Sequence, residues 1–239
     1  MVLQKNNCTE LPEEIQGLIV LINKPADWTS FDVVKKIRNI VRVKKTGHSG
    51  TLDPFAEGLM LIGIGRATKQ LAGLSALSKS YRAVVQFGVE TDSYDCTGSI
   101  TAEKDAGGLD LQEIKNALKS MSGEIEQVPP MFSAKKQGGV RLYKLARKNI
   151  EIERKAVKVT IHDVKILDWR PPDLELLLDV SKGTYIRSYA HDLGKKLGPG
   201  ASLKELKRLT IDKYSVDDSF TIREFEAFWK DRGAGVIWK

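Results

Sequence analysis

The segment Gly47–Gly58, with the sequence GHSGTLDPFAEG, lies between two strongly patterned apolar parts of the chain. Glycine and proline are unfavourable inside a regular helix or a central strand, so this segment is predicted to be a loop. A loop held between core elements is a common place for chemistry. Asp53 stands in its middle, and Pro54 biases the backbone of Asp53 towards an extended conformation.

Asp53 leaves two interpretations open. A single carboxylate in such a loop can act as a nucleophile or a general base. Asp53 and Pro54 can also form a simple turn, and the loop taken alone favours that turn because both residue types are common turn formers. A phosphate-binding loop is excluded, since neither a Gly-Lys-Ser/Thr ending nor a Gly-x-Gly-x-x-Gly pattern is present.

The composition is that of a globular protein with a basic surplus. The chain has 239 residues, and Lys plus Arg outnumber Asp plus Glu by 38 to 31, giving a net charge of +7. Such a surplus suggests a polyanionic partner. Cys8 and Cys96 are too few for a zinc cluster or a disulfide framework, and the histidines show no metal-ligand spacing. No signal core or membrane-spanning run is present, so a cytoplasmic location is expected.

Apolar runs flank the loop on both sides. Residues 17–23 and 59–65 are predicted to be buried strands. Thr29 or Ser30 can cap a helix between them. One face of this helix carries apolar residues that are expected to be buried: Phe31, Val33, Val34, Ile37, Ile40 and Val41. Residues 67–77 are predicted to form a helix and residues 79–89 a strand.

The second half of the chain continues to mix helices and strands without a regular βαβ alternation. The predicted helices are 110–121, 185–197 and 221–230, and the predicted strands include 157–167 and 174–180. Residues 201–209 are expected to form one or two helical turns, followed by a strand at 210–216. This order favours the α+β class.

Two groups of basic residues stand out. The first lies at 35–45, directly before the Asp53 loop. The second lies at 131–149, where Phe132 and Tyr143 alternate with cations and a Gly138–Gly139 pair; this part is predicted to be a mobile insertion with a short helix at about 140–148. Its cations are Lys135, Lys136, Arg141, Lys144, Arg147 and Lys148.

Arg187 and Tyr81 are further candidates, each with an ordinary alternative. The apolar neighbours of Arg187 suggest burial, and a buried guanidinium requires an anionic partner. Asp53 would fit, and the pair would keep the carboxylate ionised; equally, Arg187 can lie on the surface beside Asp192 or solvent. Tyr81, between Lys79 and Arg82, could stack on a base while its neighbours hold phosphates, or be a half-buried strand residue.

The Asp53 loop strongly resembles the catalytic motif of the TruB-type tRNA pseudouridine synthases. Further segments match motifs of that family in the same order along the chain: Leu21–Pro25 (LINKP), Lys79–Arg82 (KSYR), Ser181–Arg187 (SKGTYIR) and Gly200–Leu209 (GASLKELKRL). The resemblance covers about residues 17 to 217. Ser49, Thr51 and Glu57 depart from the commonest family pattern without removing the aspartate.

The resemblance implies an isomerase that converts uridine to pseudouridine at position 55, in the T-loop of tRNA, by base flipping. Asp53 is then the catalytic nucleophile and Arg187 its ion-pair partner, while Lys24 and Pro25 support the loop. The remaining residues that it implies in substrate binding are His48, Tyr81, Tyr185 and Leu206. The alternative is a non-catalytic tRNA-binding or tRNA-folding protein that uses the same pocket.

The resemblance also implies a pseudouridine-synthase-type fold, with a mixed, largely antiparallel sheet flanked by helices and loops. Residues 1–16 are expected to be a flexible leader, 17–217 the catalytic domain with its basic insertion at about 124–152, and 218–239 a short helical extension without a C-terminal RNA-binding PUA domain. The T-arm of tRNA is the expected partner, bound by a monomer that needs no cofactor, metal or membrane.

Overall fold

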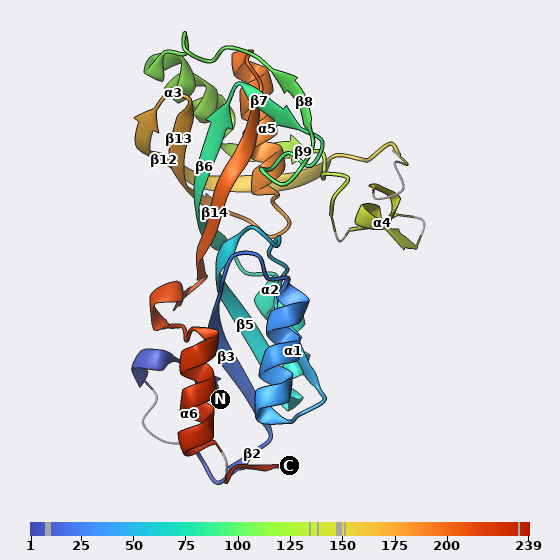
Figure 1. Cartoon of the computed structure of the whole chain (residues 1–239), viewed down its shortest axis with the longest axis vertical. Helices are drawn as coiled ribbons and strands as arrows, with labels where there is room; N and C mark the ends of the chain where they lie inside the picture. Colours follow the sequence, from blue (N-terminus) through green and yellow to red (C-terminus); the bar gives the residue numbers. More distant parts are fainter. Residues whose placement is uncertain (8–10, 134, 138, 147–149, 151, 234) are drawn as a thin grey trace. The chain divides into compact units, whose positions relative to one another are not determined.

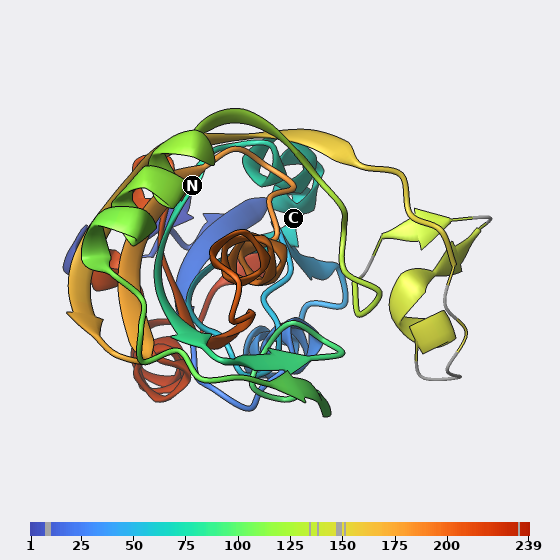
Figure 2. The same ribbon diagram turned by 90° about the horizontal axis from the view of Figure 1, so that it is seen from above.

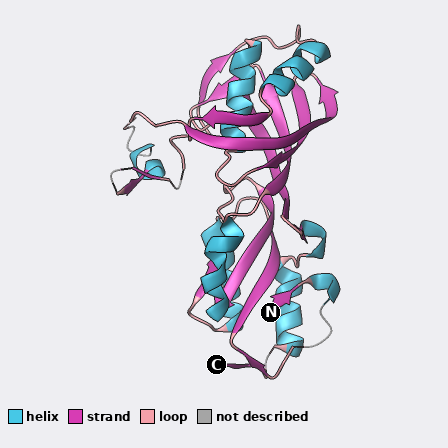
Figure 3. Cartoon of the chain, turned by 180° about the vertical axis from the view of Figure 1, so that it is seen from behind, coloured by secondary structure: helices cyan, strands magenta, loops and turns pink. Residues whose placement is uncertain are grey.

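The computed structural model describes residues 1–7, 11–133, 135–137, 139–146, 150, 152–233 and 235–239. The chain divides into two compact units. Unit 1 comprises Met1–Lys79 and Lys207–Lys239, and unit 2 comprises Ser80–Leu206. Both units combine strands with helices (Figures 1 and 3), so the predicted α+β class is confirmed. None of the helices in this described part of the chain is long and apolar enough to cross a membrane.

The centre of unit 1 is an antiparallel pair of buried strands, β3 (Gly17–Lys24) and β5 (Glu57–Gly65). Their register runs from Gly17 opposite Gly65 to Lys24 opposite Gly58. The other strands of this sheet in unit 1 are β1 (Val2–Leu3), β4 (Thr46–His48), the end of β14 (Ala201–Ile211) and β15 (Tyr214–Ser215). Since β1 pairs with β3 and β14 pairs with β5 in parallel, the sheet is mixed.

The helices of unit 1 pack beside these strands (Figure 1). They are α1 (Ser30–Val41), α2 (Leu71–Ser75) and α6 (Ile222–Arg232), with the 3₁₀ helices η1 (Lys5–Asn7), η2 (Arg66–Gln70) and η3 (Val216–Asp218). Side chains from both central strands, Ile19, Leu21, Leu59 and Leu61 among them, form the apolar core with Ile211 of β14. Residues 67–77, predicted as one helix, are split between η2 and α2.

Helix α1 begins where the sequence predicts. Thr29 is its N-cap, and Thr29 and Asp32 form a reciprocal capping box. Val33, Val34, Ile37 and Val41 are buried as expected, but Phe31 is 62% exposed, so its predicted burial is wrong. At roughly 100° per residue, Phe31 points about a quarter-turn away from the mean direction of the buried valines and isoleucine.

In unit 2 the strands follow the order β14, β6 (Lys79–Phe87), β13 (Asp173–Val180), β12 (Val157–Arg170) and β9 (Gly123–Gln127). Seen from above in Figure 2, these strands curve around helix α5 (Ile186–Leu197), whose first turns are almost completely buried. The other elements of unit 2 are β7 (Val89–Thr91), β8 (Ile100–Glu103), α3 (Leu111–Ser120), β10 (Lys136–Gln137), β11 (Val140–Arg141) and α4 (Leu142–Ala146).

The largest error of the sequence-based prediction concerns residues 201–209. They form β14 and not helical turns. The apolar residues of this segment fit neither period cleanly, and its pairing with neighbouring strands decides the outcome. The predicted helices at 110–121, 185–197 and 221–230 are confirmed as α3, α5 and α6, and the strands at 157–167 and 174–180 as β12 and β13.

The two terminal segments of the chain, expected as a flexible leader and a short helical extension, both contain strands. The expected leader contributes β1 and the short strand β2 (Glu14–Ile15), which pairs with β16 (Ile237–Trp238), and the side chains of Leu3 and Ile15 are buried. The first part of the expected insertion belongs to β9, which pairs with β12. Arg147 and Lys148 lie outside the described residues.

Candidate active site

Asp53 lies in unit 1, and both of its neighbours are held by buried groups. Ser30, the first residue of α1, donates its hydroxyl to the Leu52 carbonyl at 3.0 Å and accepts the Leu52 N–H at 2.8 Å. The Asp53 carbonyl accepts the Ala56 N–H at 3.2 Å, so the turn indicated by Asp53–Pro54 is present. The backbone on each side of the carboxylate is therefore fixed, while the Asp53 side chain is partly exposed.

Lys24 supports the other side of the loop. Its side chain is completely buried, and its ammonium donates to the carbonyls of Pro25 at 2.8 Å, Trp28 at 2.6 Å and Pro54 at 3.0 Å. Burial lowers the pKa of Lys24 from 10.5 to about 8, although nearby carboxylates, Glu57 first, act in the opposite direction. At neutral pH the ammonium form still prevails, and its three N–H donors match three acceptors.

Arg208 of β14 contacts the loop at both of its ends. Its Nε donates to the Leu59 carbonyl at 2.7 Å and its Nη2 to the Gly50 carbonyl at 3.3 Å. The backbone of Arg208 pairs with Gly58, which has a φ of +108°. A Cβ at position 58 would lie 2.2 Å from the Arg208 carbonyl oxygen, so only glycine lets the two strands approach this closely.

His48 is a neutral, partly buried imidazole at the end of β4. The Gly50 N–H donates to its Nδ1 at 3.3 Å, which assigns the remaining ring proton to Nε2. Burial lowers the pKa of His48 below its usual 6.5, and the positive charge of Arg208 acts in the same direction. Next to it, the Ser49 N–H donates to the Leu61 carbonyl and ties the loop to β5.

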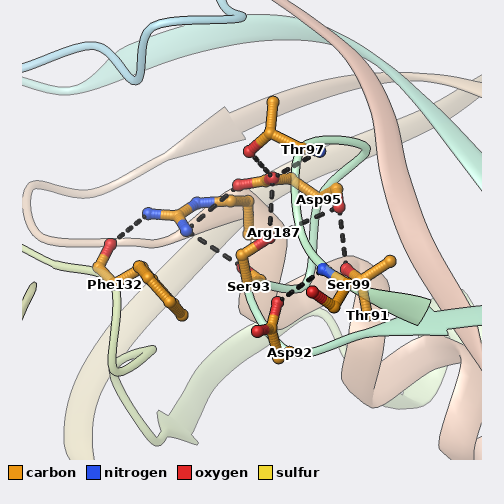
Figure 4. Close-up of polar contacts among 8 residues, drawn as sticks. All are labelled: Thr91, Asp92, Ser93, Asp95, Thr97, Ser99, Phe132 and Arg187. Atoms are coloured by element: carbon orange, nitrogen blue, oxygen red, sulfur yellow. Dashed lines mark hydrogen bonds and ion pairs between the residues drawn. The ribbon is translucent and has the colours of Figure 1, made fainter. Parts of the chain in front are cut away.

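The Arg187 cluster in unit 2 consists of Arg187, in the first turn of α5, and the groups bound to its guanidinium (Figure 4). Arg187 is 3% exposed, so the predicted burial is confirmed and the surface alternative beside Asp192 is wrong. Its Nη1 lies 3.1 Å from the Asp95 carboxylate and donates to the Ser93 carbonyl, and its Nη2 donates to the Phe132 carbonyl at 2.7 Å.

Asp95 is bound on its other side as well. Its Oδ1 accepts the Ser93 hydroxyl at 2.7 Å, the Thr97 hydroxyl at 2.6 Å and the Thr97 N–H at 3.0 Å. Asp95 is 3% exposed. The result is a buried, fully bonded carboxylate that fixes the loop between β7 and β8 against the start of α5.

Tyr185, the N-cap of α5, is oriented by Gln127 at the end of β9. The Gln127 side-chain amide accepts the Tyr185 N–H at 2.7 Å and donates to the Tyr185 carbonyl at 3.0 Å. Gln127 is completely buried. Both backbone groups of the predicted pocket residue are therefore satisfied by one side chain from a different element.

The two other predicted pocket residues of unit 2 are buried strand residues. Tyr81 of β6 and Leu206 of β14 are each 8% exposed. The cations beside Tyr81 are engaged elsewhere: Lys79 is 8% exposed and donates to the Ser75 carbonyl at 2.7 Å, while Arg82 pairs with Glu175. Tyr81 therefore fits the alternative of a buried strand residue, and phosphate binding by its flanking cations stays a prediction.

The first basic group, residues 35–45, presents several cations to solvent. Lys35, Arg42, Lys44 and Lys45 are exposed, whereas Lys36 forms an ion pair with Glu226 at 2.7 Å. Among the cations of the second group, the structure describes the side chain of Lys135, which is exposed, but not the side chains of Lys136, Arg141 and Lys144.

Comparison with known proteins places the chain in a family. The model described as TruB family pseudouridylate synthase (N-terminal domain) matches residues 38–186, and the tRNA pseudouridylate synthase B C-terminal domain matches residues 187–236. The chain belongs to the TruB family of pseudouridylate synthases. The resemblance of the Asp53 loop and its companion motifs is thereby confirmed, and the chain is an enzyme of the pseudouridine synthase type.

Curated relatives in the TruB family are similar over most of the chain. A tRNA pseudouridine synthase B of Dehalococcoides mccartyi (strain CBDB1) is 46% identical over 220 residues, which are 92% of this chain and 73% of the relative. A protein of the same name from Protochlamydia amoebophila (strain UWE25) is 50% identical over 208 residues, which are 87% of this chain and 78% of that relative.

Solved structures share the TruB-type fold. A chain in the crystal structure of a Cbf5–Nop10–Gar1 complex matches with a TM-score of 0.72 and 25% identity, covering 97% of this chain and 65% of that one. A chain of an H/ACA RNP bound to a substrate RNA containing 2′-deoxyuridine matches with a TM-score of 0.67 and 25% identity, covering 91% and 56%. The matched part therefore covers less than two thirds of either solved chain.

Several residues of this TruB-type site were not singled out from the sequence. For Asp95 a local signal exists, because the Asp95–Thr97 spacing is typical of an aspartate that accepts a backbone N–H two residues later. Ser30, Gln127 and Arg208 carried no local signal, because each acts on a partner more than twenty residues away along the chain.

Proposed function

We propose that this enzyme isomerises uridine to pseudouridine at position 55, in the T-loop of tRNA, with Asp53 as the nucleophile. The observation that carries the proposal is the Asp53 loop: a partly exposed carboxylate whose two neighbours are fixed by Ser30 and Lys24. A nucleophile held in one geometry avoids much of the entropic cost of reaching the transition state.

The chemistry matches what a single carboxylate can supply. The bond between uracil N1 and the ribose anomeric carbon breaks, the ring turns, and a bond forms from C5 to the same carbon. The proton on C5 is lost and N1 gains one, so atoms and electrons balance without an oxidant or reductant. Asp53 can attack the anomeric carbon, attack the base, or remove a sugar proton that must later be returned.

Base flipping explains the proposed roles of the other residues. The target base is enclosed in a folded RNA loop and has to leave it to reach Asp53. His48 would occupy the place that the base vacates, Tyr81 would stack on the base, and Tyr185 and Leu206 would line the pocket.

Arg187 has a defined place in unit 2 but its pairing with Asp53 stays a prediction. Its ion pair with Asp95 and its bonds to carbonyls keep the guanidinium buried and oriented. Such a preorganised cation could hold a catalytic carboxylate in its ionised form.

The relatives support tRNA as the substrate. Both curated proteins compared above carry the name tRNA pseudouridine synthase B, and this chain shares 46% and 50% of its aligned residues with them. The net charge of +7 suits an RNA partner.

The decisive experiment incubates the pure protein with unmodified tRNA and maps pseudouridine by sequence position. Wild type should form pseudouridine at position 55, and Asp53→Asn should lower the rate at least about a thousandfold, because the neutral amide cannot act as a nucleophile. Asp231→Asn is the matched control, since this carboxylate is 76% exposed on α6.

Each outcome of this experiment discriminates between functions. Normal turnover by Asp53→Asn would rule out the nucleophile. Tight binding of tRNA by wild type with no pseudouridine formed would instead favour a non-catalytic tRNA-binding or tRNA-folding protein.

A further inference from the structure

Among the side chains that the structure describes, Arg208 is the largest with less than 2% exposure, and none of the motif assignments gives it a role. We propose that Arg208 is a positioning residue for Asp53, whose guanidinium closes the Asp53 loop by binding both of its ends. This inference rests on the proposed function, because it assigns how the nucleophile is held.

The contacts define the closure. Gly50 lies three residues before Asp53 and Leu59 six residues after it, and the guanidinium of Arg208 binds the carbonyl of each, at 3.3 and 2.7 Å. Two separate N–H groups of one planar fork are needed for this, one on Nε and one on Nη2. A lysine in the same place has a single nitrogen on a different length of stem and cannot reproduce that geometry.

The burial of Arg208 indicates that its charged side chain holds the Asp53 loop. Its side chain is 1% exposed, and no carboxylate forms an ion pair with it among the described residues. A buried cation without an anionic partner is costly unless its N–H groups are well bonded. Here its hydrogen-bond acceptors are backbone carbonyls, and both belong to the Asp53 loop and its exit into β5.

The backbone of Arg208 is fixed as firmly as its side chain. In the parallel pairing of β14 with β5, Arg208 is opposite Gly58 and Lys207 opposite Glu57. The absence of a side chain at Gly58 allows this contact, since a Cβ there would collide with the Arg208 carbonyl and nitrogen. The guanidinium is therefore anchored by the same strand that borders the end of the loop.

The charge of Arg208 also reaches neighbouring titratable groups. It helps burial to lower the pKa of His48, and it adds to the lowering at Lys24. His48 therefore offers a reporter of the Arg208 charge that does not depend on catalysis.

Arg208→Lys is the primary test, because it keeps the charge and removes the fork. The single-turnover rate of pseudouridine formation should fall about tenfold to a hundredfold, as expected for a misplaced nucleophile, while the Kd for tRNA changes less than about threefold. Hydrogen exchange should rise at the amides of Ser49, Leu52 and Ala56, which report on loop closure. Arg223→Lys on α6 is the matched control, since Arg223 is exposed.

Arg208→Met adds a readout that is independent of turnover. Loss of the charge should raise the pKa of His48, measured by imidazole NMR, and the chain has only three histidines to assign. Both variants are compared at a temperature where circular dichroism shows them fully folded; if Arg208→Met does not fold, Arg208→Lys carries the test.

A rate within twofold of wild type in folded Arg208→Lys, or unchanged exchange at the loop amides, overturns the positioning role. A defect confined to the Kd for tRNA overturns it too, since it would assign Arg208 to binding. These results are distinct from failure of the proposed function, in which wild type itself makes no pseudouridine or Asp53→Asn remains active.

Discussion

At the scale of single residues, the distinctive feature of unit 1 is that two buried cations are solvated by the backbone. Lys24 and Arg208 together bind carbonyls of Pro25, Trp28, Pro54, Gly50 and Leu59. Carbonyl dipoles that are already fixed by strands and turns can compensate a charge without neutralising it. The positive potential of both cations is therefore retained beside Asp53.

The titration of Lys24 gives a test of this arrangement. Its pKa is about 8 in the folded chain and 10.5 in water. Below pH 8, Lys24 is therefore protonated in both the folded and the unfolded chain, and burial of the ammonium group destabilises the folded chain. Between pH 8 and 10.5 the folded chain loses the proton first, so stability rises by up to about 1.4 kcal/mol per pH unit, about 3 kcal/mol in all. We therefore expect the difference between the unfolding free energies of wild type and Lys24→Met to increase over this pH range.

The measurement is denaturant unfolding at pH 7, 8.5 and 10. Lys230→Met serves as the control, because Lys230 is exposed on α6 and its difference from wild type should stay flat over this range. A flat difference for Lys24→Met as well would show that Lys24 titrates like an exposed lysine.

At the scale of elements, the start of α5 is positioned by two segments that lie far from it in the sequence. Gln127 of β9 binds the backbone of Tyr185, and Asp95 of the β7–β8 loop binds Arg187. The helix therefore presents two predicted site residues from one rigid turn. Support of this kind, from groups that do not touch substrate, is what keeps a site in a productive geometry.

The Asp95–Arg187 ion pair should be energetically coupled. Asp95→Asn is expected to destabilise the chain by about 3–5 kcal/mol, since it leaves a buried guanidinium without this carboxylate. In the double variant Asp95→Asn/Arg187→Met the loss should be smaller than the sum of the two single losses, because the charge is then removed as well. Chemical denaturation of the four proteins measures this coupling.

Asp92→Asn is the control for this cycle. Asp92 lies in the same loop and accepts the Ser99 N–H, but it is exposed and forms no hydrogen bond or ion pair with Arg187. Strictly additive losses for Asp95 and Arg187 would contradict a coupled pair.

Elements with a strong period could be predicted from the sequence. The strands β3 and β5 are continuous apolar runs, and α1 and α3 each begin with a capping box that is readable from the residue types. Strand β14 could not, because its apolar spacing fits neither period cleanly and its neighbours in the sheet order, β5 and β6, lie more than a hundred residues earlier. In such cases tertiary pairing overrides local preference.

At the scale of the whole molecule, the net charge of +7 is expected to control RNA affinity through exposed cations. Lys44 and Lys45 are both exposed just before the Asp53 loop. If both neutralise phosphates, Lys44→Gln/Lys45→Gln should weaken tRNA binding and lower the slope of log Kd against log salt concentration by about 1.5. Fluorescence titration between 50 and 300 mM salt, roughly the range in which phosphate contacts are screened, measures this slope.

Lys115→Gln/Lys119→Gln provides the same change of charge on α3, where both lysines are exposed. This control should leave the slope nearly unchanged. An equal effect of the two double variants would mean that the basic surplus acts through the general field of the molecule and not through cations near the loop.

Only those residues of the candidate site that belong to a family motif could be predicted from the sequence. Resemblance identified Asp53 and suggested that Lys24 supports the loop, and the structure places Lys24 against the Pro54 carbonyl. The flanking segments could not indicate Ser30, Asp95 or Arg208, because each of these acts through a contact made only after folding. Lys79 and Arg82, the cations beside Tyr81, bind a helix-end carbonyl and a carboxylate on β13, and the sequence spacing indicates neither partner.

The pairing of β14 with β5 limits where insertions and deletions can occur in this part of the chain. Side chains of a strand alternate between its faces, so the loss or gain of one residue before position 208 would turn the guanidinium away from the Asp53 loop. A gain would bring Lys207 into its place, and a loss would bring Leu209 there. The turn at Asp212–Lys213, between β14 and β15, lies beyond this contact and carries no such restriction. Natural insertions and deletions in this part of the family should therefore collect at the turn and avoid the strand.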